Sequence, residues 1–172
     1  IFYLKYFILI RELLKDSANE IPEYLDEIIF HLGKGYDFLW GSTKHSLLFN
    51  GNHESNLDDF DKYLALQKYY FKNKKNDLGG YSILTNKNVI LAMDIGPPPE
   101  NKFSENYQSG PLSFEIIFKG KKLICNSGYF QDTKKKLNLI SRSTAAHSTL
   151  VLNNKSVANF KKDFKGKIFN KF

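Results

Sequence analysis

The chain has 172 residues, enough for one ordinary hydrophobic core, or for one small domain and a piece of another. Hydrophobic residues make up 42% of the chain and aromatic residues 15%, which excludes an intrinsically disordered protein. The net charge is +7, but only Arg11 and Arg142 are arginines, the residue type that reads bases through paired hydrogen bonds, so the composition argues against a specific nucleic-acid partner.

Helical periodicity dominates the first part of the chain. Residues 2–15 predict a helix that is apolar nearly all round, which neighbouring elements would have to cover. Residues 20–40 predict a second helix, with a proline near its first turn, where the missing N–H costs nothing. A third helix is predicted for residues 56–71, after a short strand at residues 46–50. We therefore assign residues 1–75 to a helical segment.

From Tyr81 the hydrophobic period changes from about 3.6 to about 2, which indicates strands. The predicted strands cover residues 81–85, 89–93, 111–118, 122–126 and 149–152, with one or two more beyond residue 157. A lysine-rich loop is expected at residues 128–138, and Asn153 and Asn154 suit a tight turn because Asn tolerates a positive φ. The predicted fold class is α+β, in which two or three helices precede an antiparallel β-sandwich over residues 76–172 that can be incomplete at its end.

The beginning of the chain is apolar, as the start of a membrane-spanning helix would be. The apolar run at residues 1–10 is about half as long as a membrane span and contains Lys5, so no membrane-spanning helix is expected. The first residue is Ile1 rather than Met, which is typical of a fragment or a processed piece. The single Cys125 excludes an internal disulfide, and it does not identify a compartment.

The stretch richest in chemical information covers residues 139–152 and reads LISRSTAAHSTLVL. It places Arg142 and His147 five residues apart, with small and hydroxyl-bearing residues between them. The aliphatic run that follows predicts a strand. We therefore expect His147 to lie at the start of this strand, where a rigid backbone holds its imidazole in place.

This stretch, extended to RSTAAHSTLVLNN, resembles a motif of the heparinase II/III-like polysaccharide lyases. Two upstream stretches resemble the same family in the same order: AMDIGPPP at residues 92–99 and SGPLSFEIIFKGKKLICNSG at residues 109–128. The resemblance covers about residues 79–154. It implies that residues 1–75 are the end of an incomplete α/α toroid and that the β domain forms one wall of a cleft. It also implies that the parent protein cleaves uronate-containing polysaccharide by β-elimination.

The resemblance implies a set of site residues as well. The candidate catalytic residues are His147, Arg142 and Tyr129, and the candidate substrate-binding residues are Gln108 and Asn126. A uronate lyase needs a base and an acid with tuned pKa values, and a group that neutralises the substrate carboxylate. The family carries most of this machinery in the toroid, upstream of the residues present in this chain.

Members of the family commonly bind a metal through three side chains, and the matching positions are Gln108, Asn126 and His147. Only His147 is a good zinc ligand, because neutral amide oxygens bind zinc poorly beside imidazole and carboxylate. We therefore expect no metal and no other cofactor, although zinc is the metal to consider. A hydrogen-bonded cluster of the same three side chains would replace it.

Each candidate has a structural alternative. His147 could be a half-buried residue beside an apolar strand, and Tyr129 could be part of the core. Arg142 could pair with Asp132 instead of holding an acidic sugar. Glu115 lies among apolar strand residues, and if it points inward it needs a partner, either Arg142 or a lysine.

The expected partner is an acidic polysaccharide, which a basic surface favours, unless the lysines are simply solvated. A second copy of the chain could cover the apolar helices. The alternative function is a non-catalytic carbohydrate-binding or structural β domain. A third interpretation is non-specific nucleic-acid binding, which would weaken steeply with salt. The family resemblance implies a bacterial, periplasmic protein, although a cytoplasmic one is not excluded.

Overall fold

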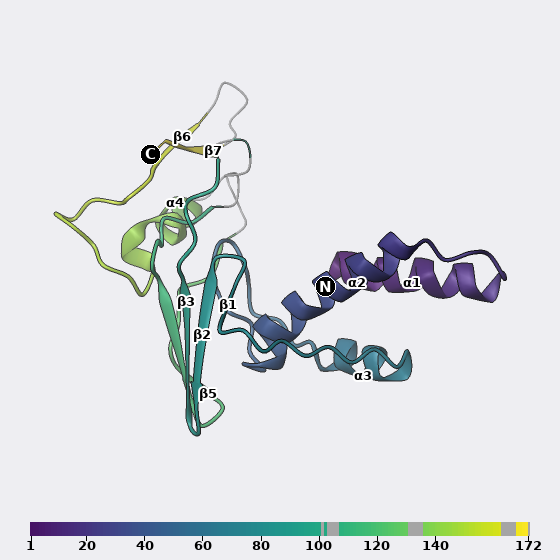
Figure 1. The fold of residues 1–172 in the computed structure, drawn as a ribbon. Helices are drawn as coiled ribbons and strands as arrows, with labels where there is room; N and C mark the ends of the chain where they lie inside the picture. The colour runs from purple at the N-terminus through teal and green to yellow at the C-terminus, as the bar shows by residue number, and fades with distance from the viewer. Residues whose placement is uncertain (101, 103–106, 131–135, 163–167, 172) are drawn as a thin grey trace. The chain divides into compact units, whose positions relative to one another are not determined.

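The computed structural model describes residues 1–100, 102, 107–130, 136–162 and 168–171. The chain divides into two compact units, which are described separately: Ile1–Ser42 with Leu57–Lys75, and Thr43–Asn56 with Asn76–Phe172. The first unit is helical and the second contains a five-stranded antiparallel sheet, so the predicted α+β class is confirmed (Figure 1).

The elements of the helical unit are α1 (Phe2–Asp16), α2 (Glu23–Tyr36), a π-helical turn (Asp37–Gly41) and α3 (Asp58–Leu66). Acidic side chains occupy the first turns of α2 and α3, where the helix dipole favours negative charge. The core of the unit combines residues from all three helices, namely Leu4, Ile8, Leu25, Ile29, Phe60 and Leu64. The three predicted helices are present, although α3 ends at Leu66 rather than near residue 71.

Asp61 of α3 accepts hydrogen bonds from the end of α2 and from the π-helical turn. Tyr36 Oη donates a hydrogen bond to Asp61 Oδ1 (2.7 Å), and Trp40 Nε1 donates to Asp61 Oδ2 (2.9 Å). Burial and the hydrogen bond to this carboxylate raise the pKa of Tyr36 above its ordinary value. One acid therefore satisfies two aromatic side chains that would otherwise bury a polar group without a partner.

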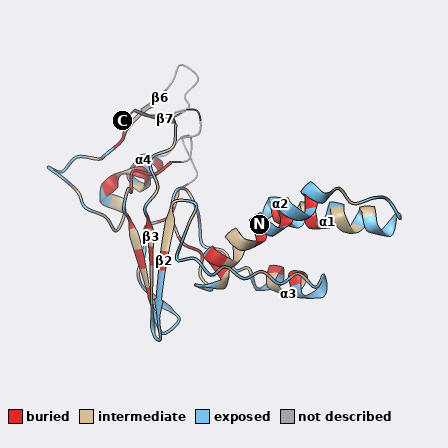
Figure 2. Ribbon diagram, viewed as in Figure 1, coloured by how far each residue is buried: buried red, intermediate tan, exposed pale blue. Residues whose placement is uncertain are grey.

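The helix α1 buries only part of its apolar surface, as Figure 2 shows by its pale exposed residues. Leu4 and Ile8 are buried, one helical turn apart. The exposed large apolar residues of the same helix are Phe2, Tyr3, Tyr6, Leu9, Ile10 and Leu13. Within the described residues, every helix is too short or too polar to cross a membrane.

The five-stranded sheet runs in the order β1-β2-β3-β4-β5, and every neighbouring pair is antiparallel. Its strands are β1 (Asp77–Leu78), β2 (Tyr81–Asn86), β3 (Val89–Asp94), β4 (Phe114–Phe118) and β5 (Lys121–Ile124). The β4-β5 hairpin turns at Lys119 and Gly120, which both have positive φ, as a two-residue turn requires. Two further strands, β6 (Asn159–Lys162) and β7 (Ile168–Lys171), pair with each other in a separate sheet.

Two predicted strands are wrong. Residues 46–50 form no strand, because the Leu48 N–H donates to the Glu115 side chain instead of a neighbouring backbone. Residues 149–152 form no strand either, apart from an isolated bridge between Leu152 and Lys155. Side-chain hydrogen bonds replace the ladder there, since Thr149 Oγ1 donates to the Pro111 carbonyl.

A short helix overlaps the start of the motif and the end of the loop expected at residues 128–138. The helix α4 covers Lys136–Arg142, and a 3₁₀ turn follows at Thr144–Ala146. His147 therefore follows a helical turn rather than opening a strand. The predicted turn at Asn153 and Asn154 is present, and both residues have positive φ.

Candidate functional site

Glu115 of β4 is the buried centre of a polar cluster in the sheet unit. Its Oε1 accepts hydrogen bonds from the backbone N–H groups of Leu48 (2.9 Å) and Asn126 (3.2 Å), and from Asn126 Nδ2 (3.3 Å). Lys122 Nζ lies 3.4 Å from its Oε2 and forms an ion pair rather than a hydrogen bond. Of the two partners expected for this acid, the lysine is present. These donors are what make a fully buried carboxylate tolerable.

Asn126 connects this carboxylate to the segment that carries His147. Asn126 Oδ1 accepts a hydrogen bond from the backbone N–H of Ser148 (3.0 Å), the residue after the histidine. Ser148 Oγ donates to the carbonyl of Cys125 (3.1 Å), so two bonds join the segments. Both ends of the Asn126 amide are thus used within the protein.

The imidazole of His147 packs directly on the backbone of Gly110. A Cβ atom at residue 110 would lie 2.9 Å from His147 Cγ, so only glycine leaves room for the ring. Nε2 of His147 is buried, and none of the described residues forms a hydrogen bond with it. Burial lowers the pKa of His147 below its ordinary value of 6.5, and a backbone hydrogen bond at Ser141 opposes that effect only in part. Burial therefore favours the neutral form of the ring.

Gln108 lies in the same region and is 1% exposed. Its Nε2 donates a hydrogen bond to the Gly128 carbonyl (3.3 Å), whereas its Oε1 is buried without a partner in the described part of the chain. Gln108 stands two residues before Gly110, which touches His147. The three positions predicted from the resemblance, Gln108, Asn126 and His147, therefore lie on neighbouring segments.

Arg142 ends α4 and is also almost fully buried, at 1% exposure. Its Nε donates a hydrogen bond to the carbonyl of Tyr107 (3.1 Å), and its own carbonyl accepts one from the Ser109 N–H (2.9 Å). Its guanidinium carbon lies 4.5 Å from the centre of the Phe160 ring. Arg142 therefore holds both ends of the segment that contains Gln108. Asp132, the partner considered from the sequence, lies outside the described residues.

Tyr129 is half-buried in the segment that follows Asn126. The carbonyl of the preceding residue, Gly128, is the acceptor for Gln108. This places the Tyr129 backbone next to the cluster. Its suggested role in catalysis stays a prediction.

The donor set does not fit the three-ligand zinc site that the resemblance implies. Asn126 Oδ1 is occupied by the Ser148 N–H, and Gln108 offers a neutral amide oxygen. His147 supplies the one nitrogen that zinc prefers. Over the described ranges, no three His, Cys, Asp or Glu side chains gather as a metal site would need. Asn126 instead joins the Glu115 carboxylate to the segment of His147 through hydrogen bonds.

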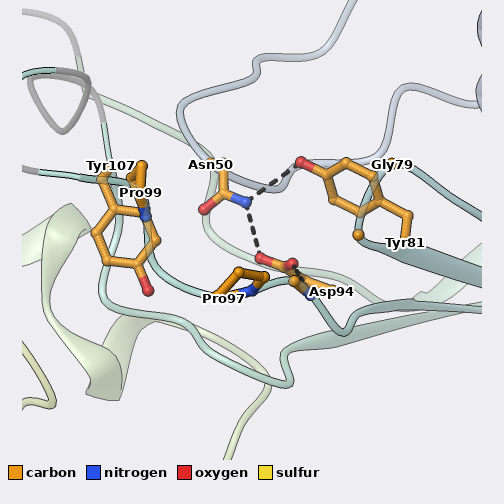
Figure 3. Close-up of a pocket in the computed structure, with 9 residues that line it drawn as sticks. Asn50, Gly79, Tyr81, Asp94, Pro97, Pro99 and Tyr107 are labelled. Atoms are coloured by element: carbon orange, nitrogen blue, oxygen red, sulfur yellow. Dashed lines mark hydrogen bonds between the residues drawn. The ribbon is translucent and has the colours of Figure 1, made fainter.

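The sheet unit contains a pocket of about 410 Å³ that the sequence analysis did not predict (Figure 3). Its lining residues are Asn50, Gly79, Gly80, Tyr81, Asp94, Gly96, Pro97, Pro99 and Tyr107. Asn50 Nδ2 donates to Asp94 Oδ2 (2.7 Å) and to Tyr81 Oη (3.2 Å), and the Gly96 N–H donates to Asp94 Oδ1 (3.2 Å). Burial nevertheless raises the pKa of Asp94 above its ordinary value.

One sequence signal could have indicated this pocket. Asp94 ends an apolar strand and is followed at once by Ile95, Gly96 and three prolines, so a charged side chain stands at the start of a stiff loop. Nothing local points to Asn50, which is 44 residues away in the chain.

Together, the sheet and the cluster around Glu115 and His147 define a β domain with a built polar centre, preceded by helices. A family model described as Heparinase II/III-like, C-terminal, matches residues 72–167. The chain belongs to the heparinase II/III-like family.

Solved structures of a heparinase III and of a heparan sulfate lyase have a similar fold. The heparinase III BT4657 gene product matches 92% of this chain and 30% of its own, with a TM-score of 0.73 and 16% identity. The heparan sulfate lyase HepC from Pedobacter heparinus matches 93% of this chain and 30% of its own, with a TM-score of 0.67 and 18% identity. At such identities the likeness shows the fold, and the chain spans about 30% of the length of these proteins. No curated protein sequence matches the chain.

Proposed function

We propose that this chain is part of a polysaccharide lyase that cleaves acidic, uronate-containing polysaccharide by β-elimination. The observation that carries the proposal is that the segments of Asn126 and His147 are joined by a hydrogen bond from the Ser148 N–H, while the segment that follows Gln108 packs on the His147 ring through Gly110. Family membership supports the same reaction class. An acidic polysaccharide as partner and a periplasmic location belong to this proposal.

His147 is suited to the base step of such a reaction. In β-elimination a base takes the proton next to the uronate carboxylate, the electron pair forms a carbon–carbon double bond, and the bond to the 4-linked sugar breaks. The leaving oxygen then receives a proton from an acid. Because burial lowers its pKa, His147 is unprotonated near neutral pH and can accept a proton. Tyr129 is the phenol proposed as the acid.

The amides and the arginine have supporting roles in this proposal. Gln108 and Asn126 were predicted to bind the sugar, but both are almost fully buried, and both ends of the Asn126 amide are bonded within the protein. We therefore propose that they position the segments next to His147. We place Arg142 as a positioning residue rather than a ligand of the sugar, because its buried guanidinium is held by the Tyr107 carbonyl and the Phe160 ring. It acts by holding the segment that carries Gln108.

The test is a lyase assay on the full-length protein. Ultraviolet absorbance of the unsaturated uronate product would be followed on heparin, heparan sulfate, alginate and hyaluronate, with and without a chelator. We expect product on at least one polymer and its loss in His147→Ala. The matched control is His31→Ala, which changes an exposed histidine of α2. No product on any polymer would contradict the proposal.

The alternative is a non-catalytic carbohydrate-binding β domain. The observation that favours it is the amide character of Gln108 and Asn126, which leaves His147 as the one good metal ligand of the three. Binding to one of the same polymers without any product would identify this alternative. In that case His147→Ala would change stability more than binding.

A further inference from the structure

The pocket around Asp94 is acidic in a protein that is basic as a whole. The chain has a net charge of +7, yet Asp94 is the one charged side chain among the described residues that line this pocket. An anion entering it would meet a carboxylate that no lysine or arginine among these described lining residues neutralises. Because the site is partly buried, salt would screen that repulsion only weakly. The pocket is therefore suited to a ligand without negative charge.

Asp94 also has acceptor capacity left for a ligand. An ionised carboxylate offers about four lone-pair positions. The described donors that reach it are Asn50 Nδ2 and the Gly96 N–H, which account for two of them. Asp94 is 6% exposed, and its raised pKa indicates that these two bonds do not fully compensate for its burial. Hydroxyl groups of a ligand would supply the missing donors.

The rest of the lining presents flat, weakly polar surfaces. In Figure 3, Tyr81 and Tyr107 lie on either side of the pair formed by Asn50 and Asp94, with Pro97 beside it. The Tyr81 ring is held by stacking on Phe49, with ring centres 5.7 Å apart and planes inclined by 23°. A few oriented polar groups between aromatic and apolar walls are typical of sites for small ligands, and about 410 Å³ lies within their usual size.

We infer that this pocket binds one uncharged, hydroxyl-rich sugar ring. The ring hydroxyls donate to Asp94, Asn50 supports that carboxylate from the other side, and the tyrosine and proline surfaces pack on the ring faces. A ring that carries a carboxylate is rejected by Asp94. The inference does not rest on lyase activity, because a protein that cleaves nothing could still hold a neutral ring here.

The test compares two tetrasaccharides by titration calorimetry with the full-length protein. Cellotetraose is the neutral probe, and the glucuronic acid tetramer of the same linkage is the matched acidic probe. We expect the acidic tetramer to bind at least about tenfold more weakly, because like charges face each other in the pocket. Equal affinity for the two probes, or no binding of cellotetraose, would overturn the inference, whatever the lyase assay shows.

Two variants test whether the binding occurs at this pocket. Asp94→Asn is expected to weaken cellotetraose binding by about tenfold, since hydrogen bonds to a charged group are lost. Tyr81→Phe keeps the wall and removes one hydroxyl, so about threefold weaker binding is expected even if the first variant does not fold. Asp77→Asn, the same change on exposed β1, is the control and should bind normally. Normal binding by both pocket variants would place the ligand elsewhere.

Discussion

Arg142 is the largest of the fully buried side chains, and its surroundings explain how a guanidinium is tolerated there. The Tyr107 carbonyl accepts from its Nε and the Phe160 ring faces the cation. A planar guanidinium can donate hydrogen bonds in its own plane and stack its face on an aromatic ring at the same time. The compact ammonium of lysine cannot do both. At the residue scale, Arg142 therefore acts through the shape of its head group as well as its charge.

We expect Arg142→Lys to destabilise the protein by about 2 kcal/mol, because the charge is kept but the donor geometry is lost. Arg142→Ala should cost about 4 kcal/mol, as is usual for emptying a large buried site. Urea unfolding followed by circular dichroism measures both. The control is Arg11→Lys, since Arg11 makes partly exposed ion pairs with Glu12 and Asp26; it should cost under about 1 kcal/mol. Equal stabilities for Arg142→Lys and wild type would refute this account.

His147 predicts a specific dependence of stability on pH. Burial lowers the pKa of the folded imidazole below the ordinary 6.5, so the unfolded chain takes up a proton first as the pH falls. The neutral imidazole of His147 therefore contributes its full stability to the folded state above pH 6.5. This contribution is lost as the pH falls through the lower pKa of the folded protein. Thermal unfolding across this range should show a smaller acid loss in His147→Gln than in wild type. His31→Gln, on an exposed residue of α2, should leave the wild-type slope unchanged.

At the scale of elements, α2 contains two glycines with opposite surroundings. A Cβ at Gly33 would lie 2.1 Å from two atoms of the Phe71 ring, whereas a Cβ at Gly35 would meet nothing within 4 Å. Phe71 follows α3 and packs against the core of the helical unit. Gly33 is therefore required by close packing, while Gly35 only lowers the helix propensity of α2.

Gly33→Ala and Gly35→Ala should accordingly change stability in opposite directions. Gly35→Ala should stabilise the helical unit by about 0.5–1 kcal/mol, the usual difference in helix propensity. Gly33→Ala should destabilise it by about 1–3 kcal/mol, because the Phe71 ring must move. Fluorescence of Trp40, the single tryptophan and a buried residue of this unit, reports its unfolding in urea. Stabilisation by both changes would show that Phe71 does not require the glycine.

At the scale of the whole molecule, the main feature is the apolar surface that α1 leaves exposed to solvent. Its six exposed large apolar residues include Tyr6, Leu9 and Leu13. Such a surface is typical of an interface rather than of a free helix. The chain spans about 30% of the length of its structural relatives, so we propose that further helices of a toroid, or a second copy, cover it.

The 172-residue chain by itself is therefore expected to self-associate. Sedimentation velocity should show a weight that rises with concentration. Leu9→Lys combined with Leu13→Lys should return the chain to a monomer, because charge on this surface prevents apolar contact. The control is Leu66→Lys, at an α3 position that is 80% exposed and lies on another helix. A wild-type chain that stays monomeric at every concentration would contradict this prediction.

Much of the secondary structure follows from local signals. The helices α2 and α3 and the strands β2 to β5 were predictable because their apolar residues recur with a regular period along the chain. The helix α1 was predicted from a stretch that is apolar nearly all round. The family motif was likewise readable as a continuous stretch. The strand predicted at residues 149–152 is absent because polar groups in and next to this stretch bond to residues from other segments. A local sequence pattern cannot show such bonds.

The sequence by itself therefore determined the fold class and the family, and it singled out three polar positions whose role stays a prediction. Only the tertiary structure decided what surrounds them. Three of its hydrogen bonds join residues that are 35 to 67 positions apart in the chain. They link Leu48 to Glu115, Arg142 to Tyr107, and Asn50 to Asp94. Contacts of that kind depend on how the sheet, α4 and the loops pack, and no local period encodes them. Both the cluster and the pocket consist of such contacts.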